Sequence, residues 1–246
     1  MCRMVGVVFR SRFPIESLVA LREVAGTGRI PEEEEPGHGD GWGIVSFSRG
    51  SPELVGKSIR PAHIDPSFDA AMASAGTATG PSILIAHVRA ASAGSVSMKN
   101  THPFISGDLV LAHNGTVKGE IPGANQAPKG DTDSERLLML LSDRYARTKD
   151  LVGSVTGLVR DDLKDAKYRG MILLVSDGSR LVGFRKVNQM DWEWYYKLKV
   201  AVRATDVMLF QEVPTGCAVD GSVSEVEDGE LVSIGLDLSV SRTKVL

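Results

Sequence analysis

Short apolar runs separated by turn-forming residues dominate the pattern of this chain. Several runs rich in Val, Ile, Leu and Phe have the length of strands, and Gly, Pro, Asp or Ser cluster around most of them. We predict strands over residues 5–9, 43–47, 83–88, 109–113, 171–175, 181–184, 199–202 and 231–234. Asp177-Gly178, between two of these runs, is a favoured two-residue hairpin turn.

Helical periodicity is found in fewer segments, and we predict helices over residues 15–25, 66–75, 133–147 and 151–164. Thr132 and Glu135 have the spacing of a capping box at the start of the third helix, with Thr132 as N-cap. Long loops are predicted at 26–41 and 118–130. Because strands and helices do not alternate regularly, we expect an α+β protein with largely antiparallel sheets rather than a doubly wound fold.

Composition and charge exclude several classes of protein. A chain of 246 residues can bury a large core, and we predict a single domain over residues 1–246. The net charge of -3 offers no basic surface for nucleic acid. No apolar run approaches the roughly 20 residues of a membrane helix, and the first residues lack the apolar region of a signal peptide. We therefore expect a cytoplasmic protein that binds neither nucleic acid nor membrane.

The two cysteines form neither a disulfide framework nor a zinc motif. No metal site is predicted, because the histidines have no Cys or carboxylate neighbours at ligand spacing, and no cofactor is predicted, because no phosphate-binding Gly-rich loop is present. Cys217 lies among small and apolar residues, which is typical of a buried, inert thiol.

Cys2 differs from Cys217 because removal of Met1 would make it the N-terminal residue. It would then carry both a thiol and a free α-amine, whose reference pKa is about 7.7–8.0. Such an amine can act as the general base for the thiol of its own residue. The alternative is that Cys2 is an incidental residue near the terminus.

His113-Asn114-Gly115 directly follows the apolar run 109–112. A strand that ends there would present Asn114 Nδ2 and the Gly115 N–H as an oxyanion hole. The alternative is an ordinary turn, since Asn-Gly is a common hairpin pair.

Arg89 and Asp133 are candidates for binding a charged ligand. Arg89 ends a predicted buried strand, where its guanidinium can hold a carboxylate through two parallel hydrogen bonds or form a structural ion pair. Asp133 lies in the first turn of a predicted helix, where it can receive an ammonium group or simply complement the helix dipole. Together with Cys2 and Asn114, these groups suit a free α-amino acid with a cleavable side-chain carbonyl, such as glutamine.

Short motifs occurring in one order make the chain resemble the class II glutamine amidotransferases of the N-terminal-nucleophile hydrolase superfamily. They are Met1-Cys2, GHGDGWGI at 37–44, HVR at 87–89, NTHPF at 100–104, HNG at 113–115 and TDSE at 132–135. The resemblance implies a four-layer αββα sandwich of two mostly antiparallel sheets.

The same resemblance implies roles for individual residues. Cys2 would be the nucleophile, and Asn114 and Gly115 the oxyanion hole. Arg89 would bind the α-carboxylate of glutamine and Asp133 its α-amino group. Ser92, in the segment after Arg89, is predicted as a further substrate-binding residue. The histidines inside the motifs are expected to be structural, because the family uses the α-amine as base; they are His38, His87, His102 and His113.

One position departs from the amidotransferases that make amino sugars, since Ala90 stands where they have Trp. The Gly-His-x-Asp-Gly-Trp-Gly pattern is closer to the stand-alone glutaminase branch. We therefore predict hydrolysis of the γ-amide of L-glutamine through a Cys2 thioester, with any synthase or acceptor subunit bound in trans. The alternatives are a hydrolase of γ-glutamyl peptides or thiol conjugates, and a non-catalytic glutamine-binding subunit.

Overall fold

The computed structural model describes residues 2–33, 35–119, 121–212 and 221–246. Within these ranges the strands form one sheet of seven and one of six, and neighbouring strands pair antiparallel. Met1 and Cys217 lie outside the described residues, so the predictions made for them stay predictions.

The first sheet consists, in spatial order, of β11 (Ser222–Glu225), β9 (Lys199–Val202), β10 (Asp206–Phe210), β1 (Cys2–Phe9), β4 (Ser82–Arg89), β2 (Trp42–Ser48) and β3 (Ser51–Ser58). The second consists of β13 (Val240–Lys244), β12 (Glu230–Gly235), β8 (Arg180–Val187), β7 (Lys167–Ser176), β6 (Leu109–Lys118) and β5 (Phe104–Ser106).

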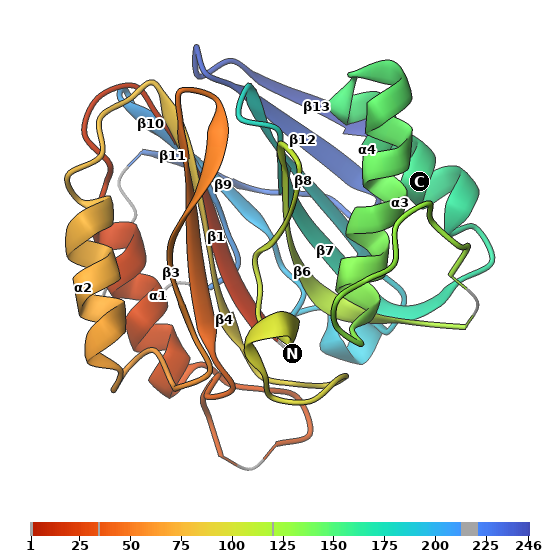
Figure 1. Ribbon diagram of the computed structural model, residues 1–246, viewed down its shortest axis with the longest axis horizontal. Helices are drawn as coiled ribbons and strands as arrows, with labels where there is room; N and C mark the ends of the chain where they lie inside the picture. The colour runs from red at the N-terminus through yellow and green to blue at the C-terminus, as the bar shows by residue number, and fades with distance from the viewer. Residues whose placement is uncertain (1, 34, 120, 213–220) are drawn as a thin grey trace.

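Helices cover the outer face of each sheet (Figure 1). The helices α1 (Glu16–Thr27) and α2 (Pro66–Ala75) pack on the first sheet, and α3 (Asp133–Thr148) and α4 (Leu151–Gly157) pack on the second. One hydrophobic cluster fills the space between the sheets, and two others fill the spaces beneath the helix pairs. The predicted α+β class and the four-layer αββα sandwich are confirmed. Among the described residues, no helix has the length and hydrophobicity needed to cross a membrane.

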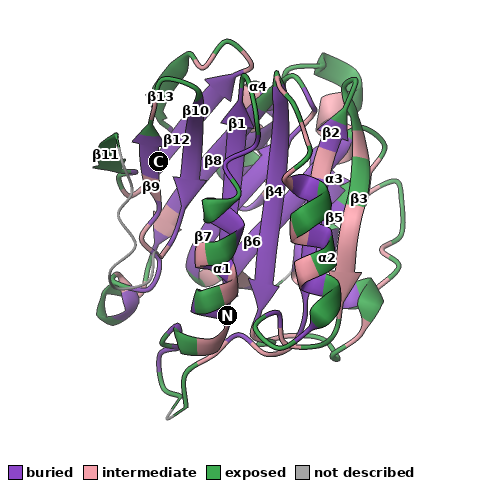
Figure 2. Ribbon diagram, turned by 90° about the vertical axis from the view of Figure 1, so that its left-hand side faces the viewer, coloured by how far each residue is buried: buried purple, intermediate pink, exposed green. Residues whose placement is uncertain are grey.

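The central strands β1 and β4 are buried along their whole length (Figure 2). Because side chains alternate across a strand, β1 contributes to two cores. Met4 and Val8 face the other sheet, whereas Val5 and Val7 face the helices. Cys2 shares the inter-sheet face of Met4, so the apolar alternation of β1 directs the Cys2 side chain between the sheets.

The prediction that a strand ends in Asn-Gly is wrong, and so is its alternative of a hairpin turn. The strand β6 continues to Lys118, with Asn114 paired to Ile172 and a bulge between Gly115 and Val117. Gly115 has a φ of +154°, and a Cβ on it would collide with the carbonyl oxygen of Gly170. Glycine is therefore required here by the neighbouring strand rather than by a turn.

Several strands give no apolar signal in the sequence. Every residue of β11 and β13 is exposed, and β3 is at most half-buried.

The hairpin between β7 and β8 is confirmed, but its turn is longer than two residues, because Ser176 pairs with Leu181.

The predicted helix over 151–164 is wrong in its second half. The α-helix ends at Gly157 and a π-helical turn, Leu158–Asp162, follows. Arg144 of α3 binds the carboxylates of Asp161 and Asp162, which ties this wider turn to the neighbouring helix.

Half of the predicted capping box is confirmed. Thr132 Oγ1 accepts a hydrogen bond from the Glu135 N–H at 3.3 Å. The Glu135 carboxylate does not return to Thr132, and instead accepts from the N–H groups of Lys129 and Gly130 at 3.0 and 2.6 Å. Glu135 therefore anchors the end of the loop that precedes α3.

Candidate active site

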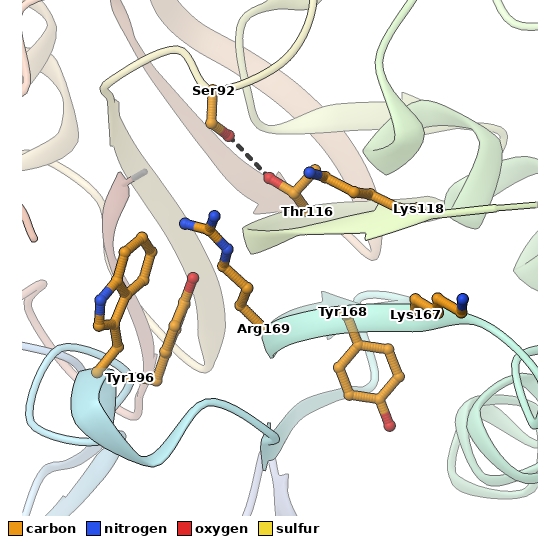
Figure 3. A pocket seen from close by; sticks show the side chains of 8 residues that line it. Ser92, Thr116, Lys118, Lys167, Tyr168, Arg169 and Tyr196 are labelled. Carbon is orange, nitrogen blue, oxygen red and sulfur yellow. Dashed lines mark hydrogen bonds between the residues drawn. The ribbon is translucent and has the colours of Figure 1, made fainter. Parts of the chain in front are cut away.

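A cavity of about 380 Å³ opens where β6 and β7 meet the segment that follows β4 (Figure 3). Ser92 lines it from that segment, and Thr116 and Arg169 line it from the two strands. The hydroxyl oxygens of Ser92 and Thr116 are 2.9 Å apart and share a hydrogen bond. Ser92, predicted as a substrate-binding residue, thus links the segment after β4 to the second sheet.

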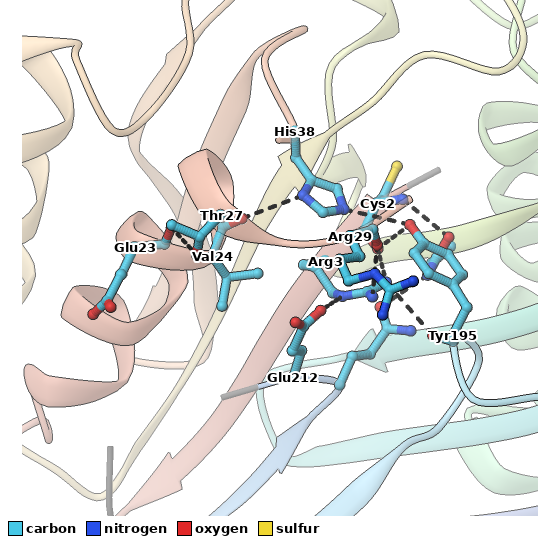
Figure 4. Close-up of polar contacts among 11 residues, drawn as sticks. Cys2, Arg3, Glu23, Val24, Thr27, Arg29, His38, Tyr195 and Glu212 are labelled. Carbon is cyan, nitrogen blue, oxygen red and sulfur yellow. Dashed lines mark hydrogen bonds and ion pairs between the residues drawn. The ribbon is translucent and has the colours of Figure 1, made fainter. Parts of the chain in front are cut away.

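Both the backbone nitrogen and the carbonyl oxygen of Cys2 are hydrogen-bonded (Figure 4). Its nitrogen donates a hydrogen bond to Asn114 Oδ1 at 3.1 Å. Its carbonyl oxygen accepts from the Tyr195 hydroxyl at 3.1 Å and from Arg3 Nη1 at 3.2 Å. Its Sγ lies 3.9 Å from the carbonyl oxygen of Ala90. The thiol is therefore directed toward the segment after Arg89.

Asn114 is fully buried beside Cys2 and has a second partner. Its Nδ2 donates to Gln211 Oε1 at 3.1 Å. Because an amide nitrogen carries two hydrogens, one Nδ2–H has no acceptor among the described residues. Gln211 is absent from the sequence motifs, although it directly follows β10, whose Phe210 pairs with Val5 of β1. That strand pairing brings Gln211 to the site.

Arg3 and Tyr195 are further contacts that the motifs do not include. Arg3 Nε lies 2.6 Å from a Glu212 carboxylate oxygen, and the Arg3 guanidinium stacks 3.8 Å from the centroid of the Tyr195 ring. Burial raises the pKa of Tyr195 well above its usual value, so its hydroxyl remains protonated and donates to Cys2. The sequence contained one indication of these contacts. Arg3 is a charged residue in an otherwise apolar strand, and a buried charge needs a partner.

Arg89 is placed directly opposite Cys2 by the pairing of β1 with β4. Its terminal nitrogens donate to the carbonyl oxygens of Ser95 and Ala93 at 3.1 and 3.0 Å. Within the described ranges Arg89 forms no ion pair, and its role in binding a carboxylate stays a prediction. A buried guanidinium held only by neutral carbonyls keeps its affinity for an incoming carboxylate.

Two motif residues fix the segment that follows Arg89. Asp40 Oδ2 accepts from the Ala91 N–H at 2.7 Å. Asn100 Nδ2 donates to the Ser95 carbonyl oxygen at 3.0 Å, and its Oδ1 accepts from the Asp131 N–H at 3.1 Å. The segment beside the Cys2 thiol is thus anchored at both ends, which explains why the motifs contain these two residues.

Asp133 is the first residue of α3 and also contacts β6. Its Oδ2 accepts from the Val117 N–H at 2.6 Å, and its Oδ1 lies 3.5 Å from Ser134 Oγ. The carboxylate therefore joins the helix to the strand that carries Asn114 and Gly115. Its first-turn position fits both predicted roles.

The motif histidines are buried. The rings of His87 and His102 are stacked with centroids 4.3 Å apart, and His113 Nδ1 lies 2.9 Å from Ser134 Oγ. Burial lowers the pKa of His87 to about 3 and lowers those of His102 and His113, so these rings are neutral near pH 7. In the part of the chain that the structure describes, no group of three or more His, Cys, Asp or Glu side chains could hold a metal ion.

A cationic side chain lies close to the histidines. Lys57 Nζ donates to the carbonyl oxygens of Thr101 and Pro103 at 2.7 and 2.8 Å. Burial lowers the pKa of Lys57 to about 8. This lysine fastens the segment between the Asn100 motif and β5 to the edge strand β3.

Comparison with known proteins gives a consistent picture. The family model of glutamine amidotransferases class-II matches residues 1–204. The chain is 30% identical over 165 residues to the putative glutamine amidotransferase YafJ of Escherichia coli K12, and the aligned region covers 61% of this chain and 62% of that protein. It is 29% identical over 196 residues to the gamma-glutamyl-hercynylcysteine sulfoxide hydrolase of Mycobacterium tuberculosis CDC 1551. The aligned region covers 79% of this chain and 75% of that protein.

A third relative and two solved structures extend the comparison. The chain is 30% identical over 199 residues to the uncharacterized protein MJ1515 of Methanocaldococcus jannaschii, and it spans 51% of that protein. A class-II domain protein from Silicibacter pomeroyi matches with a TM-score of 0.64 at 17% identity, over 99% of both chains. The phosphoribosylpyrophosphate amidotransferase of Bacillus subtilis matches with a TM-score of 0.68 at 19% identity, over all of this chain and 49% of that one. At such identities, the solved structures show the fold alone.

Proposed function

The chain belongs to the class II glutamine amidotransferases, and we propose that it hydrolyses the γ-amide bond of L-glutamine or of a larger γ-glutamyl compound, with Cys2 as nucleophile. One observation carries this proposal. The Cys2 nitrogen lies 3.1 Å from Asn114 Oδ1, with the thiol directed toward the segment after Arg89. Once Met1 is removed, that nitrogen is a free α-amine held next to the thiol it must deprotonate.

The reaction then proceeds through a thioester. The α-amine takes the thiol proton, and the thiolate attacks the side-chain carbonyl carbon of the substrate. The free Nδ2–H of Asn114 and the N–H of Gly115 stabilise the oxyanion. The C–N bond breaks and the leaving nitrogen takes the proton from the α-ammonium. Water, deprotonated by the same amine, hydrolyses the thioester and releases glutamate.

Substrate binding uses the charged groups around Cys2. We assign the α-carboxylate of the glutamyl group to Arg89, whose guanidinium donates to backbone carbonyl oxygens of the described residues. We assign the α-ammonium to Asp133, one oxygen of which is already engaged by Val117. Ser92 would contact the substrate from the mouth of the cavity. An acceptor subunit bound in trans would receive the ammonia.

Two features favour a substrate larger than glutamine as the second candidate. The cavity lined by Ser92 and Thr116 has a volume of about 380 Å³. The Mycobacterium tuberculosis relative is named as a hydrolase of a γ-glutamyl compound, and it matches 79% of this chain. A cavity of this size, lined by Thr116 two residues beyond Asn114 on β6, can hold a leaving group larger than ammonia.

The test combines intact mass with turnover. We expect the purified protein to lack the mass of Met1 and to release glutamate from glutamine or from γ-glutamyl peptides. Cys2→Ala should lose at least about 10³-fold in kcat, because the nucleophile is removed. Cys217→Ala is the matched control and should keep its activity.

Two outcomes would count against this assignment. Full turnover by Cys2→Ala would exclude the thioester route. A protein that keeps Met1, binds glutamine and releases no glutamate would instead favour the non-catalytic glutamine-binding alternative.

A further inference from the structure

The cavity beside the proposed catalytic residues has an unusual distribution of charge. Lys118 of β6 and Lys167 of β7 are directly paired across the two strands, and both line the cavity. Like charges directly opposite each other destabilise a sheet. Arg169, two residues along β7 from Lys167, adds a third cation to the same wall. Figure 3 shows Arg169 and Lys167 extending in opposite directions along β7, while Lys118 extends toward Thr116. Lys118 and Arg169 are therefore the two cations that favour an anion on the Ser92–Thr116 side of the cavity.

Nothing in the described lining neutralises these cations. The described side chains that line the cavity include no carboxylate. Arg169 lies 3.7 Å from Glu32, but both side chains are about half exposed or more, so this pair is weak. Within the described ranges neither lysine forms an ion pair. The Arg169 guanidinium is also oriented, since it lies 4.5 Å from the centroid of the Trp192 ring.

The cavity begins close to the reacting atoms. Thr116 lies two residues beyond Asn114 on β6, a distance of roughly 7 Å along a strand. Ser92 lies two residues beyond Ala90, whose carbonyl oxygen is near the Cys2 thiol. Tyr196, on another wall, packs edge-to-face against Tyr195, whose hydroxyl donates to the Cys2 carbonyl oxygen. A γ-glutamyl group bound through Arg89 on the first sheet would thus direct its leaving group toward the second sheet.

We propose that this cavity receives a leaving group that bears a carboxylate, so that the preferred substrate is a γ-glutamyl amino acid or a short γ-glutamyl peptide. The proposal rests on the function proposed above and specifies its substrate class. The Cys2 thiolate displaces the amine from the γ-carbonyl carbon, and the leaving amine takes the proton from the Cys2 α-ammonium. Water then hydrolyses the thioester, and the proton released when the glutamate carboxyl ionises leaves the free amino acid as its zwitterion. Lys118 and Arg169 would bind its carboxylate. The volume of about 380 Å³ falls within the range of small-molecule sites.

The test uses a pair of substrates that differ only in this charge. We would measure kcat/KM for γ-glutamylalanine and for γ-glutamylalaninamide, with glutamine as a third substrate. The wild-type protein should prefer the acid over the carboxamide by about tenfold or more, and the preference should shrink with salt. In the double variant Lys118→Gln/Arg169→Gln the ratio of acid to carboxamide should fall toward one.

Lys164→Gln is the matched control, because Lys164 is a well-exposed lysine that does not line the cavity. It should leave the ratio of acid to carboxamide unchanged.

The outcomes separate failure of the substrate class from failure of the function. If glutamine is hydrolysed but the acid and the carboxamide react equally, the substrate class is wrong and the function stands. If no substrate is hydrolysed, the function is wrong, and calorimetry with Cys2→Ala then tests the cavity alone. Equal binding of acid and carboxamide there, or a preference for a cationic leaving group, would overturn the proposal.

Discussion

Two polar clusters near the start of β1 differ in how their atoms are satisfied. The amine cluster comprises the Cys2 backbone, Asn114 and Gln211, and both polar atoms of the Asn114 side chain are hydrogen-bonded there. The histidine cluster comprises His87, His102 and His113. Within the described residues, both ring nitrogens of His102 and Nε2 of His113 have no hydrogen-bond partner.

The two clusters meet at β6, where His113 and Asn114 are neighbours whose side chains lie on opposite faces. On the Asn114 face, hydrogen bonds fix the position of the group that is proposed to exchange protons. On the His113 face, burial keeps the rings neutral, and a neutral ring costs far less to bury than a charged one. Hydrogen bonds therefore fix both polar atoms of the Asn114 side chain, whereas His102 is held by ring stacking and His113 by one hydrogen bond to Ser134.

Among side chains of the two clusters, the largest expected effect comes from changing Asn114 in the amine cluster. Asn114→Ala removes both the partner of the Cys2 nitrogen and the proposed oxyanion donor. We expect kcat to fall by about 10²–10³-fold, the usual cost of losing one oxyanion-hole donor. Asn125→Ala, at an exposed asparagine, is the control and should retain activity. A loss of kcat below tenfold for Asn114→Ala would show that Asn114 is not an oxyanion donor.

The histidine cluster should make the free energy of unfolding depend on pH. The folded-state pKa of His87 is lowered to about 3, below the value of about 6.5 expected in the unfolded chain. Between these values the unfolded state binds more protons, so the free energy of unfolding falls as the pH falls from 6.5 toward 3. Each such histidine contributes a slope of up to about 1.4 kcal/mol per pH unit. Urea denaturation between pH 7 and pH 4 measures this slope.

A variant can assign the slope to the cluster. His102→Phe keeps an aromatic ring between His87 and Phe104 and removes one titrating group, so the slope should decrease. His63→Gln, at an exposed histidine, should leave it unchanged. A wild-type protein equally stable at pH 7 and pH 4 would contradict the assignment of these rings as neutral and desolvated.

The smallest expected effect concerns the residue that orients Asn114. Gln211→Leu removes the acceptor of Asn114 Nδ2 and should lower kcat about tenfold with little change in KM, the cost of one misaligned hydrogen bond. Gln211→Glu keeps an oxygen acceptor and should recover most of the loss. Equal defects in both variants, or a defect in KM alone, would show that Gln211 supports the fold rather than orienting Asn114.

The central strands and the motif residues could be predicted from the sequence because their signals are local. β1 and β4 are buried on both faces and therefore have nearly continuous apolar runs. Thr132 caps its helix through a contact only three residues away. The edge strands β11 and β13 could not be predicted in this way, because exposed strands have no apolar alternation.

The rest of the candidate site depends on contacts between distant parts of the chain. Gln211 reaches Asn114 only because β10 pairs with β1. Tyr195 reaches the Cys2 carbonyl across 193 positions of sequence. Lys118 and Lys167 face each other through the register of β6 and β7, which a bulge shifts. No local pattern encodes a strand register, so these neighbours become visible only in the folded structure.

The pairing of Cys2 with Arg89 has a consequence for substrate length. Because β1 and β4 are hydrogen-bonded neighbours, the spacing between the two backbones is fixed at about 5 Å and cannot adapt to the ligand. The two strands would thus fix the distance between the group that binds the α-carboxylate of a substrate and the thiol that attacks its side-chain carbonyl. Asparagine, which is one methylene shorter than glutamine, could satisfy Arg89 or reach the thiol, but not both at once. Discrimination between these two amides would then reside in the backbone register rather than in any side chain.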